Sequence, residues 1–146
     1  MTYRRILVGY DGSPPATAAL LHAIELAAQC GAQLLAAAVA RVPEYAGTVD
    51  EVNGALEDAR RYFEATLDRA AALAKDRGVE LTTHVLVGHP AEALVRFAQD
   101  QGVDLIVVGP RGLSGVRRLL LGSVSAALVR HAPCSVLVYR ERSGAA

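Results

Sequence analysis

A glycine- and arginine-rich run from Gly109 to Ser123 contains residue types that could bind phosphate. It holds four glycines and no acidic residue, and its cations are Arg111, Arg117 and Arg118. Glycines let backbone N–H groups approach an anion without a Cβ in the way. Gly122 and Ser123 then open a predicted helix, whose first N–H groups and dipole favour negative charge. The pattern indicates a phosphate site, with a basic surface loop capped by Ser123 as the alternative.

A carboxylate follows another short apolar run. Asp11 comes directly after the predicted strand Ile6–Gly9, where it could accept hydrogen bonds from ribose hydroxyls or help hold a metal-bound water. Its alternative role is that of a turn residue in the Asp-Gly pair. In open α/β sheets, ligands bind beyond the carboxyl ends of neighbouring strands. If one ligand contacts both turns, the first and fourth strands are adjacent and a nucleotide is favoured.

Apolar runs of strand length alternate with longer helical patterns along the chain. The predicted strands are Ile6–Gly9, Leu34–Val39, Leu81–Val87, Leu105–Val108 and Ser135–Tyr139. The predicted helices are Pro14–Cys30, a helix from Val49 or Gly54 to Arg77, Ala91–Gln101 and Ser123–His131. Right-handed crossovers then place the second and third strands on one side and the fifth on the other. The sequence predicts one α/β domain over residues 1–146: an open parallel five-stranded sheet, order 3-2-1-4-5, with helices on both faces.

Local signals mark the ends of these elements. Ser13 is placed to cap the first helix and Gly31 to end it. The polar stretch Arg41–Asn53 is the only long irregular segment that the pattern predicts, and such loops are often functional or mobile.

Composition excludes several classes of protein. Fifteen basic and fifteen acidic residues cancel, so overall charge suggests no nucleic-acid partner. Lys75 is the only lysine and lies far from any glycine-rich turn, which excludes a Walker-type phosphate site.

Cys30 and Cys134 form no metal or redox motif and are expected to be buried free thiols. The run Ile6–Val8 is too short for a signal peptide or membrane span, which predicts a cytoplasmic protein.

No catalytic motif emerges from the remaining polar residues. The four histidines have no metal-ligand spacing, and they are His22, His84, His89 and His131. Ser114 and Ser123 have no His/Asp partner at the spacing of a serine hydrolase. These residues are therefore interpreted as structural or solvent-facing.

The chain resembles the universal stress protein family, in its ATP-binding branch. That branch carries Gly-x-x-Gly, nine residues, then Gly-Ser or Gly-Thr, and Gly109, Gly112 and Gly122-Ser123 reproduce the spacing. Similar signatures are Arg5–Ser13, Gly88–Glu92, Leu119–Ser123 and His131–Cys134. The fold implied is Rossmann-like and close to the adenine nucleotide alpha hydrolases, although Asp11-Gly12-Ser13 lacks the second glycine of the ATP pyrophosphatase loop.

The resemblance implies a site for ATP or ADP, with Mg²⁺. Asp11 would contact the ribose or the metal side of ATP, and any contact to the metal would be made through water. Val39 would pack near adenine, and Gly9 and Val108 would flank the base. The residues implied to hold ribose and phosphates, the two serines through both hydroxyls and backbone donors, are Gly109, Gly112, Gly122, Ser123, Val124 and Ser125. Two departures stand out: Pro110 replaces a small polar residue or alanine and removes one N–H, and Ala38-Val39-Ala40 replaces a common His-Val.

The last predicted strand is expected to form a homodimer. Ser135–Tyr139 lies at a sheet edge in the predicted order, yet contains no charge or proline to discourage pairing. A two-fold partner could add its own last strand antiparallel, as members of the family often do.

Taken together, these features predict a nucleotide-binding protein with a regulatory or protective role in stress. No general base or catalytic carboxylate pair accompanies the phosphate site, so at most slow ATP hydrolysis is expected. The alternatives are that slow ATPase, or an interaction module of the same fold that binds no nucleotide.

Overall fold

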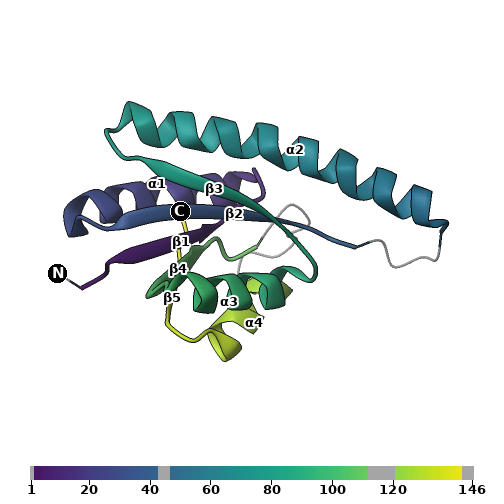
Figure 1. The fold of residues 1–146 in the computed structure, drawn as a ribbon. Coiled ribbons are helices and arrows are strands. Elements are labelled where there is room, and N and C mark those ends of the chain that lie inside the picture. The colour runs from purple at the N-terminus through teal and green to yellow at the C-terminus, as the bar shows by residue number, and fades with distance from the viewer. Residues whose placement is uncertain (1, 43–46, 112–120, 143–146) are drawn as a thin grey trace.

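Four helices cover the two faces of a five-stranded parallel sheet in the computed structural model (Figure 1). The structure describes residues 2–42, 47–111 and 121–142. Its strands are β1 (Arg5–Gly9), β2 (Gln33–Ala40), β3 (Leu81–Val87), β4 (Leu105–Val108) and β5 (Ser135–Val138). Its helices are α1 (Pro14–Cys30), α2 (Val49–Asp76), α3 (Pro90–Gln101) and α4 (Ser123–His131). The strand order β3-β2-β1-β4-β5 confirms the predicted topology.

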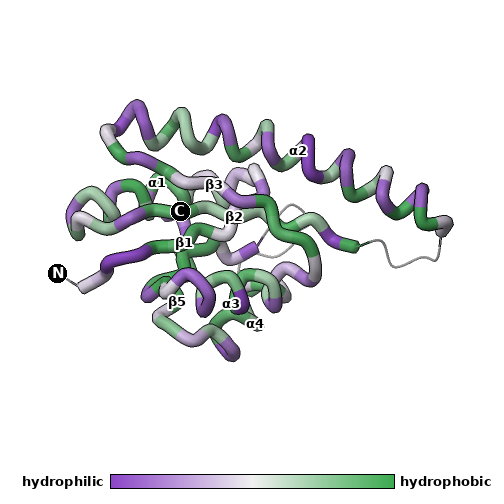
Figure 2. Tube along the Cα trace, in the orientation of Figure 1, coloured by the Kyte–Doolittle hydropathy of each residue, from purple (hydrophilic) through white to green (hydrophobic). Residues whose placement is uncertain are grey.

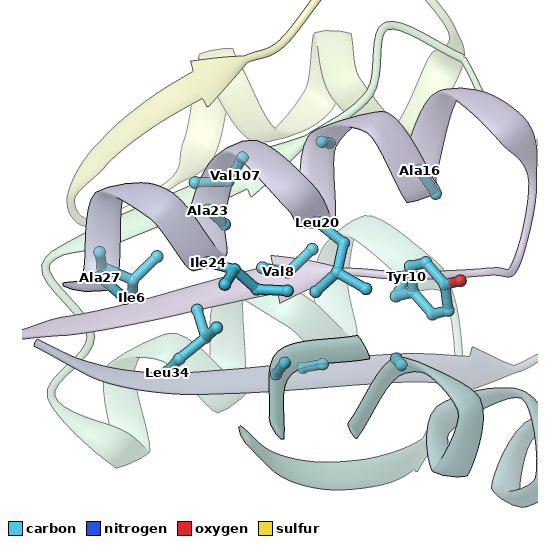
Figure 3. Close-up of a cluster of buried hydrophobic side chains, with 14 of the residues drawn as sticks. Ile6, Val8, Tyr10, Ala16, Leu20, Ala23, Ile24, Ala27, Leu34 and Val107 are labelled. Atoms are coloured by element: carbon cyan, nitrogen blue, oxygen red, sulfur yellow. The ribbon is translucent and has the colours of Figure 1, made fainter. Parts of the chain in front are cut away.

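The central strands are apolar because both of their faces are covered. Along β1, Ile6 and Val8 pack in the core under α1 and α2, whereas Leu7 packs in the core under α3 and α4. All three are 0% exposed. Figure 3 shows Leu20 and Ile24 of α1 lying over β1. Full burial of such a side chain contributes about 1.5–3 kcal/mol, so these two layers hold β1 and β4 side by side.

The first helix begins and ends as its sequence predicts. The Ser13 side chain accepts a hydrogen bond from the Ala16 N–H at 3.3 Å, and Gly31 closes the helix in the left-handed region at φ 66°. These two ends fix where α1 sits over β1, so the β1–α1 turn is held at the carboxyl end of the sheet.

The second helix is longer than the sheet that it covers. It begins at Val49, where the Thr48 hydroxyl caps the Glu51 N–H at 3.1 Å, so the irregular segment is shorter than predicted. Figure 1 shows the amino-terminal part of α2 extending past the ends of the strands. Polar and apolar residues alternate along this helix in Figure 2, as expected for a helix that buries one face.

Other boundaries differ by one or two residues. The ladder of β5 ends at Val138 rather than at Tyr139, although the Tyr139 N–H still donates to the Val108 carbonyl at 2.8 Å. Within the described residues, no helix has the length and apolar character needed to cross a bilayer.

Candidate functional site

The two turns that carry the candidate chemistry leave the same edge of the sheet. Strands β1 and β4 are direct neighbours, with Val8 paired to Val107. The chain passes from β1 into α1 on one face and from β4 toward α4 on the other. The predicted adjacency of the first and fourth strands is therefore confirmed. The crevice between two such crossovers is where open α/β sheets bind ligands.

Gly9 and Gly109 allow these turns to approach their neighbours closely. A Cβ on Gly9 would lie 3.0 Å from Val108 Cγ1, and one on Gly109 would lie 3.0 Å from both the carbonyl carbon and oxygen of Pro15. Pro15 belongs to the first turn of α1. The absence of a side chain at Gly109 therefore brings the end of β4 against the start of α1.

The Asp11 carboxylate stabilises its own turn. Its Oδ1 accepts a hydrogen bond from the Ser13 N–H at 2.9 Å, so the turn role is present. Gly12 has φ +82°, a conformation that favours glycine, and a Cβ there would lie 2.9 Å from Thr66 Cγ2 of α2. Asp11 is only partly buried, which leaves its second oxygen available at the mouth of the crevice.

The Pro110 carbonyl joins the end of β4 to the start of α4. It accepts hydrogen bonds from the Gly122 N–H at 2.6 Å and from the Ser125 hydroxyl at 2.8 Å. Ser125 Oγ also lies 3.1 Å from the Gly122 carbonyl oxygen. Sequence reasoning pointed only to the N–H that Pro110 lacks and missed this role of its carbonyl. Since Ser125 is 4% exposed, its hydroxyl anchors the helix and its N–H is the group left for a ligand.

The first turn of α4 presents unpaired backbone donors. Gly122 is the N-cap and no side-chain cap hydrogen bond is present, so the expectation that Ser123 is the cap is wrong, while residues 112–120 of the loop lie outside the described residues. Within the described part of the chain, the N–H groups of Ser123, Val124 and Ser125 have no acceptor. Unpaired donors at a helix N-terminus are suited to an anion.

The apolar candidates lie on the face that α3 and α4 cover. Val108 is 5% exposed and belongs to the core on that face, and Val39 of β2 packs against the same core. Gly112 lies outside the described residues. The structure thus brings Gly9, Val108, Gly109 and the start of α4 to one edge, with Val39 one strand beyond β1.

Arg111 is a further candidate that sequence reasoning did not single out as a site residue. Its guanidinium Nε and Nη1 are buried and have no hydrogen-bond partner among the described residues. The run of arginines drew attention to positive charge in general, but no sequence pattern distinguishes a buried arginine from an exposed one.

The amino ends of the strands form a different environment. A depression of about 620 Å³ there is lined in part by Arg5, Gly31, Glu80, His84 and Gln101. Helices α1 and α3 end at this edge, at Gly31 and Gly102. Helix C-termini carry partial negative charge, so this end of the sheet disfavours phosphate.

The cysteines and acidic residues provide no separate catalytic or metal centre in the described residues. No group of three His, Cys, Asp or Glu side chains that could hold a metal occurs there. Both cysteines are free but only half-buried rather than fully buried. Burial, and next the Asp104 carboxylate, raises the pKa of the Cys134 thiol above its ordinary value, which keeps it protonated and weakly nucleophilic at neutral pH.

A family model described as the universal stress protein family matches residues 2–140. The chain belongs to that family. Universal stress protein MJ0531 of Methanocaldococcus jannaschii is 34% identical over 141 residues, covering 95% of this chain and 83% of that protein. Universal stress protein UspA from Lactobacillus plantarum has a TM-score of 0.88 at 27% identity, covering 96% of this chain and 99% of that one.

A further solved structure is a universal stress protein in complex with cAMP. It has a TM-score of 0.76 at 30% identity and covers 97% of this chain and 100% of that one. A protein similar to this one over its whole length therefore binds an adenine nucleotide.

Proposed function

We propose that this universal stress protein binds an adenine nucleotide, ATP or ADP, in the cytoplasm and has a regulatory or protective role in stress. The observation that carries the proposal is the first turn of α4, where three N–H groups without an acceptor among the described residues lie at the carboxyl edge of β1 and β4. The Pro110 carbonyl anchors this turn through two hydrogen bonds. A preorganised set of donors binds an anion without the cost of ordering a loop.

Each part of the nucleotide has candidate contacts. The N–H groups of Ser123, Val124 and Ser125, with the Ser123 hydroxyl, bind phosphate. Gly109 and Gly112 provide backbone close to the ribose, and Gly9, Val39 and Val108 pack against adenine. The relative solved with cAMP supports an adenine ligand.

Magnesium fits this site only as part of the nucleotide complex. Mg²⁺ is commonly held by one or two carboxylates together with substrate phosphates and water. Asp11 is the carboxylate that the sequence singled out at this edge, and the Ser13 N–H already uses one of its oxygens. Asp11 would therefore hold Mg²⁺ through water, and the ion would neutralise phosphate charge.

Binding rather than turnover is the proposed activity. Donors that hold the phosphates equally in ground and transition states increase affinity without lowering the barrier. Calorimetric titration of the purified chain with ATP and ADP separates this proposal from an interaction module without nucleotide, for which no heat of binding is expected.

Replacement of Gly122 by aspartate tests the site most directly. Gly122 has the extended conformation of an N-cap, φ −70° and ψ 167°, and aspartate is among the best N-cap residues. A Cβ there would lie 3.3 Å from the Pro110 carbonyl oxygen, so the turn must shift slightly. Gly122→Asp should still fold, while its carboxylate occupies the free N–H groups and repels phosphate. Losing a charge-assisted contact of about 1.5–3 kcal/mol weakens ATP binding by roughly tenfold or more, as measured by calorimetry.

The matched control is Gly54→Asp on α2, where a Cβ would meet no atom within 4 Å. This control should bind ATP like the unmodified protein. Unchanged ATP affinity in a folded Gly122→Asp protein would refute the proposed site.

We also propose that the protein forms a homodimer through the Ser135–Tyr139 edge. Strand β5 pairs with β4 alone and lies at the end of the sheet. Its apolar residues Val136, Leu137 and Val138 remain partly exposed in the single chain. A second β5, added antiparallel, would satisfy the open backbone groups and cover these side chains.

Val138→Lys places a charge in the pairing strand and should shift the protein toward monomer in sedimentation experiments. Val49→Lys is the control, because Val49 is 75% exposed on α2, away from β5. A monomeric unmodified protein at concentrations well above micromolar would contradict the dimer.

A further inference from the structure

Arg111 is partly buried, and no ion pair with it is found among the described residues. Its Nε and Nη1 atoms are buried without a hydrogen-bond partner. By contrast, the ion pairs Arg61–Glu57 and Arg96–Glu92 are exposed pairs on helix surfaces. Burying a charge without a partner costs free energy, so the Arg111 position calls for a counter-charge.

The main chain places Arg111 beside the first turn of α4. A Cβ on Gly122 would lie 3.4 Å from Arg111 Cα and 3.9 Å from Arg111 Cβ. The two hydrogen bonds to the Pro110 carbonyl hold this contact in place. The Cα and Cβ atoms of Arg111 therefore lie beside the N-cap of α4, next to the turn that presents the unpaired donors.

Two acidic residues near this edge make contacts with groups other than Arg111. Asp11 Oδ1 accepts a hydrogen bond from the Ser13 N–H at 2.9 Å, and Glu92 of α3 pairs with Arg96 at 3.5 Å. Within the described residues, no carboxylate forms an ion pair with Arg111. A ligand at this edge could supply the negative charge that the described residues do not provide.

We propose that the Arg111 guanidinium binds a phosphate of the nucleotide and makes the site select phosphorylated ligands over nucleosides. This inference rests on the proposed nucleotide binding. The planar guanidinium forms paired hydrogen bonds with phosphate oxygens, which an ammonium group cannot reproduce. The donors of α4 would hold one side of the phosphate group and Arg111 another.

The binding test compares ATP with adenosine. Arg111→Gln should weaken ATP binding by roughly tenfold or more and leave adenosine binding unchanged, both measured by competition against a fluorescent ATP analogue. Arg111→Lys should recover only part of the loss. Arg130→Gln removes the same charge from an exposed position near the end of α4 and should bind ATP normally.

Two results would overturn the inference. The first is an ATP affinity of Arg111→Gln within about threefold of that of the unmodified protein, because a charge-assisted contact should contribute more than this. The second is an equal loss of affinity for adenosine and for ATP. The proposed function fails separately, if the unmodified protein binds neither ligand.

Ligand-free stability provides a second readout. Arg111→Met replaces the buried charge by an apolar chain of similar length, so its urea midpoint without nucleotide should equal or exceed that of the unmodified protein. Saturating ATP should then raise the midpoint of the unmodified protein more than that of the variant. A lower midpoint for Arg111→Met without nucleotide would mean that the guanidinium has a structural role, and would overturn the inference.

Discussion

The two ends of the sheet each contain an arginine with buried nitrogen atoms, but they differ in the charge that surrounds it. At the amino end, Arg5 Nε is buried and has no partner among the described residues. Arg5 Nη2 donates a hydrogen bond to Gln101 Oε1 at 3.4 Å. The Arg5 backbone N–H donates to the Asp104 carboxylate at 3.0 Å. The C-termini of α1 and α3 add partial negative charge there. At the carboxyl end, Arg111 lies beside the N-terminus of α4, so positive groups gather without a paired acid. Arg5 thus has a side-chain hydrogen bond and an acid close to its backbone, whereas the two buried nitrogens of Arg111 have no partner among the described residues.

Glycines at the two ends differ in a parallel way. Gly31 and Gly102 have φ values of +66° and +64°, and a Cβ added to either would meet no atom within 4 Å, so they end helices by their conformation. Gly9 and Gly109 have no such positive φ and instead allow close contacts. Glycine therefore provides backbone freedom at Gly31 and Gly102 and space at Gly9 and Gly109, whereas Gly12 at the carboxyl end combines a positive φ with a close contact.

Gly109→Ala should have the larger effect on stability. Its Cβ would lie 3.0 Å from the backbone of Pro15, which cannot move aside as a flexible side chain could. Overpacking of this kind costs about 1–3 kcal/mol, and the shift of β4 against α1 should also weaken ATP binding. Urea unfolding measures the first effect and calorimetry the second.

The baseline for this substitution is Gly54→Ala in exposed α2, which should stabilise the protein by about 0.5–1 kcal/mol through helix propensity. If Gly109→Ala is as stable as Gly54→Ala, the close contact with Pro15 is not required.

Gly102→Ala should have a smaller effect, confined to stability. The left-handed conformation costs an alanine about 1 kcal/mol, and the site at the opposite end should keep its ATP affinity. Gly102→Asn should recover part of the loss, since asparagine tolerates this conformation. Gly109→Asn should be no more stable than Gly109→Ala. A recovery of stability in Gly109→Asn would show that Gly109 and Gly102 are glycines for the same reason.

Much of the fold could be predicted because it rests on local patterns. The alternation of apolar strands with amphipathic helices, together with right-handed crossovers, leads to the order 3-2-1-4-5. Ser13 and Gly31 mark the ends of α1 through short-range hydrogen bonding and conformation. The sequence left the start of α2 undecided between Val49 and Gly54. The Thr48 cap favours the earlier start, whereas the low helical propensity of Gly54 opposes it.

The candidate site was predictable as a place, but less so as a set of contacts. Glycine spacing and the turn at Asp11 located it at the ends of β1 and β4. The Pro110 carbonyl was missed because its partners, Gly122 and Ser125, are twelve and fifteen positions away in the chain, and their approach depends on how α4 packs. Ser125 was predicted to offer its hydroxyl, yet that group is hydrogen-bonded to backbone.

The sequence by itself determined the α/β architecture, the family and the edge at which the candidate site lies, because periodicity and spacing are properties of the chain alone. Tertiary structure decided which groups are free to act. The Ser125 hydroxyl bonds to the Pro110 carbonyl, and the first three N–H groups of α4 have no acceptor among the described residues. The Cα and Cβ atoms of Arg111 lie beside the same turn, and two of its nitrogens are buried. Burial and hydrogen-bond pairing arise between distant segments, so only the folded chain shows them.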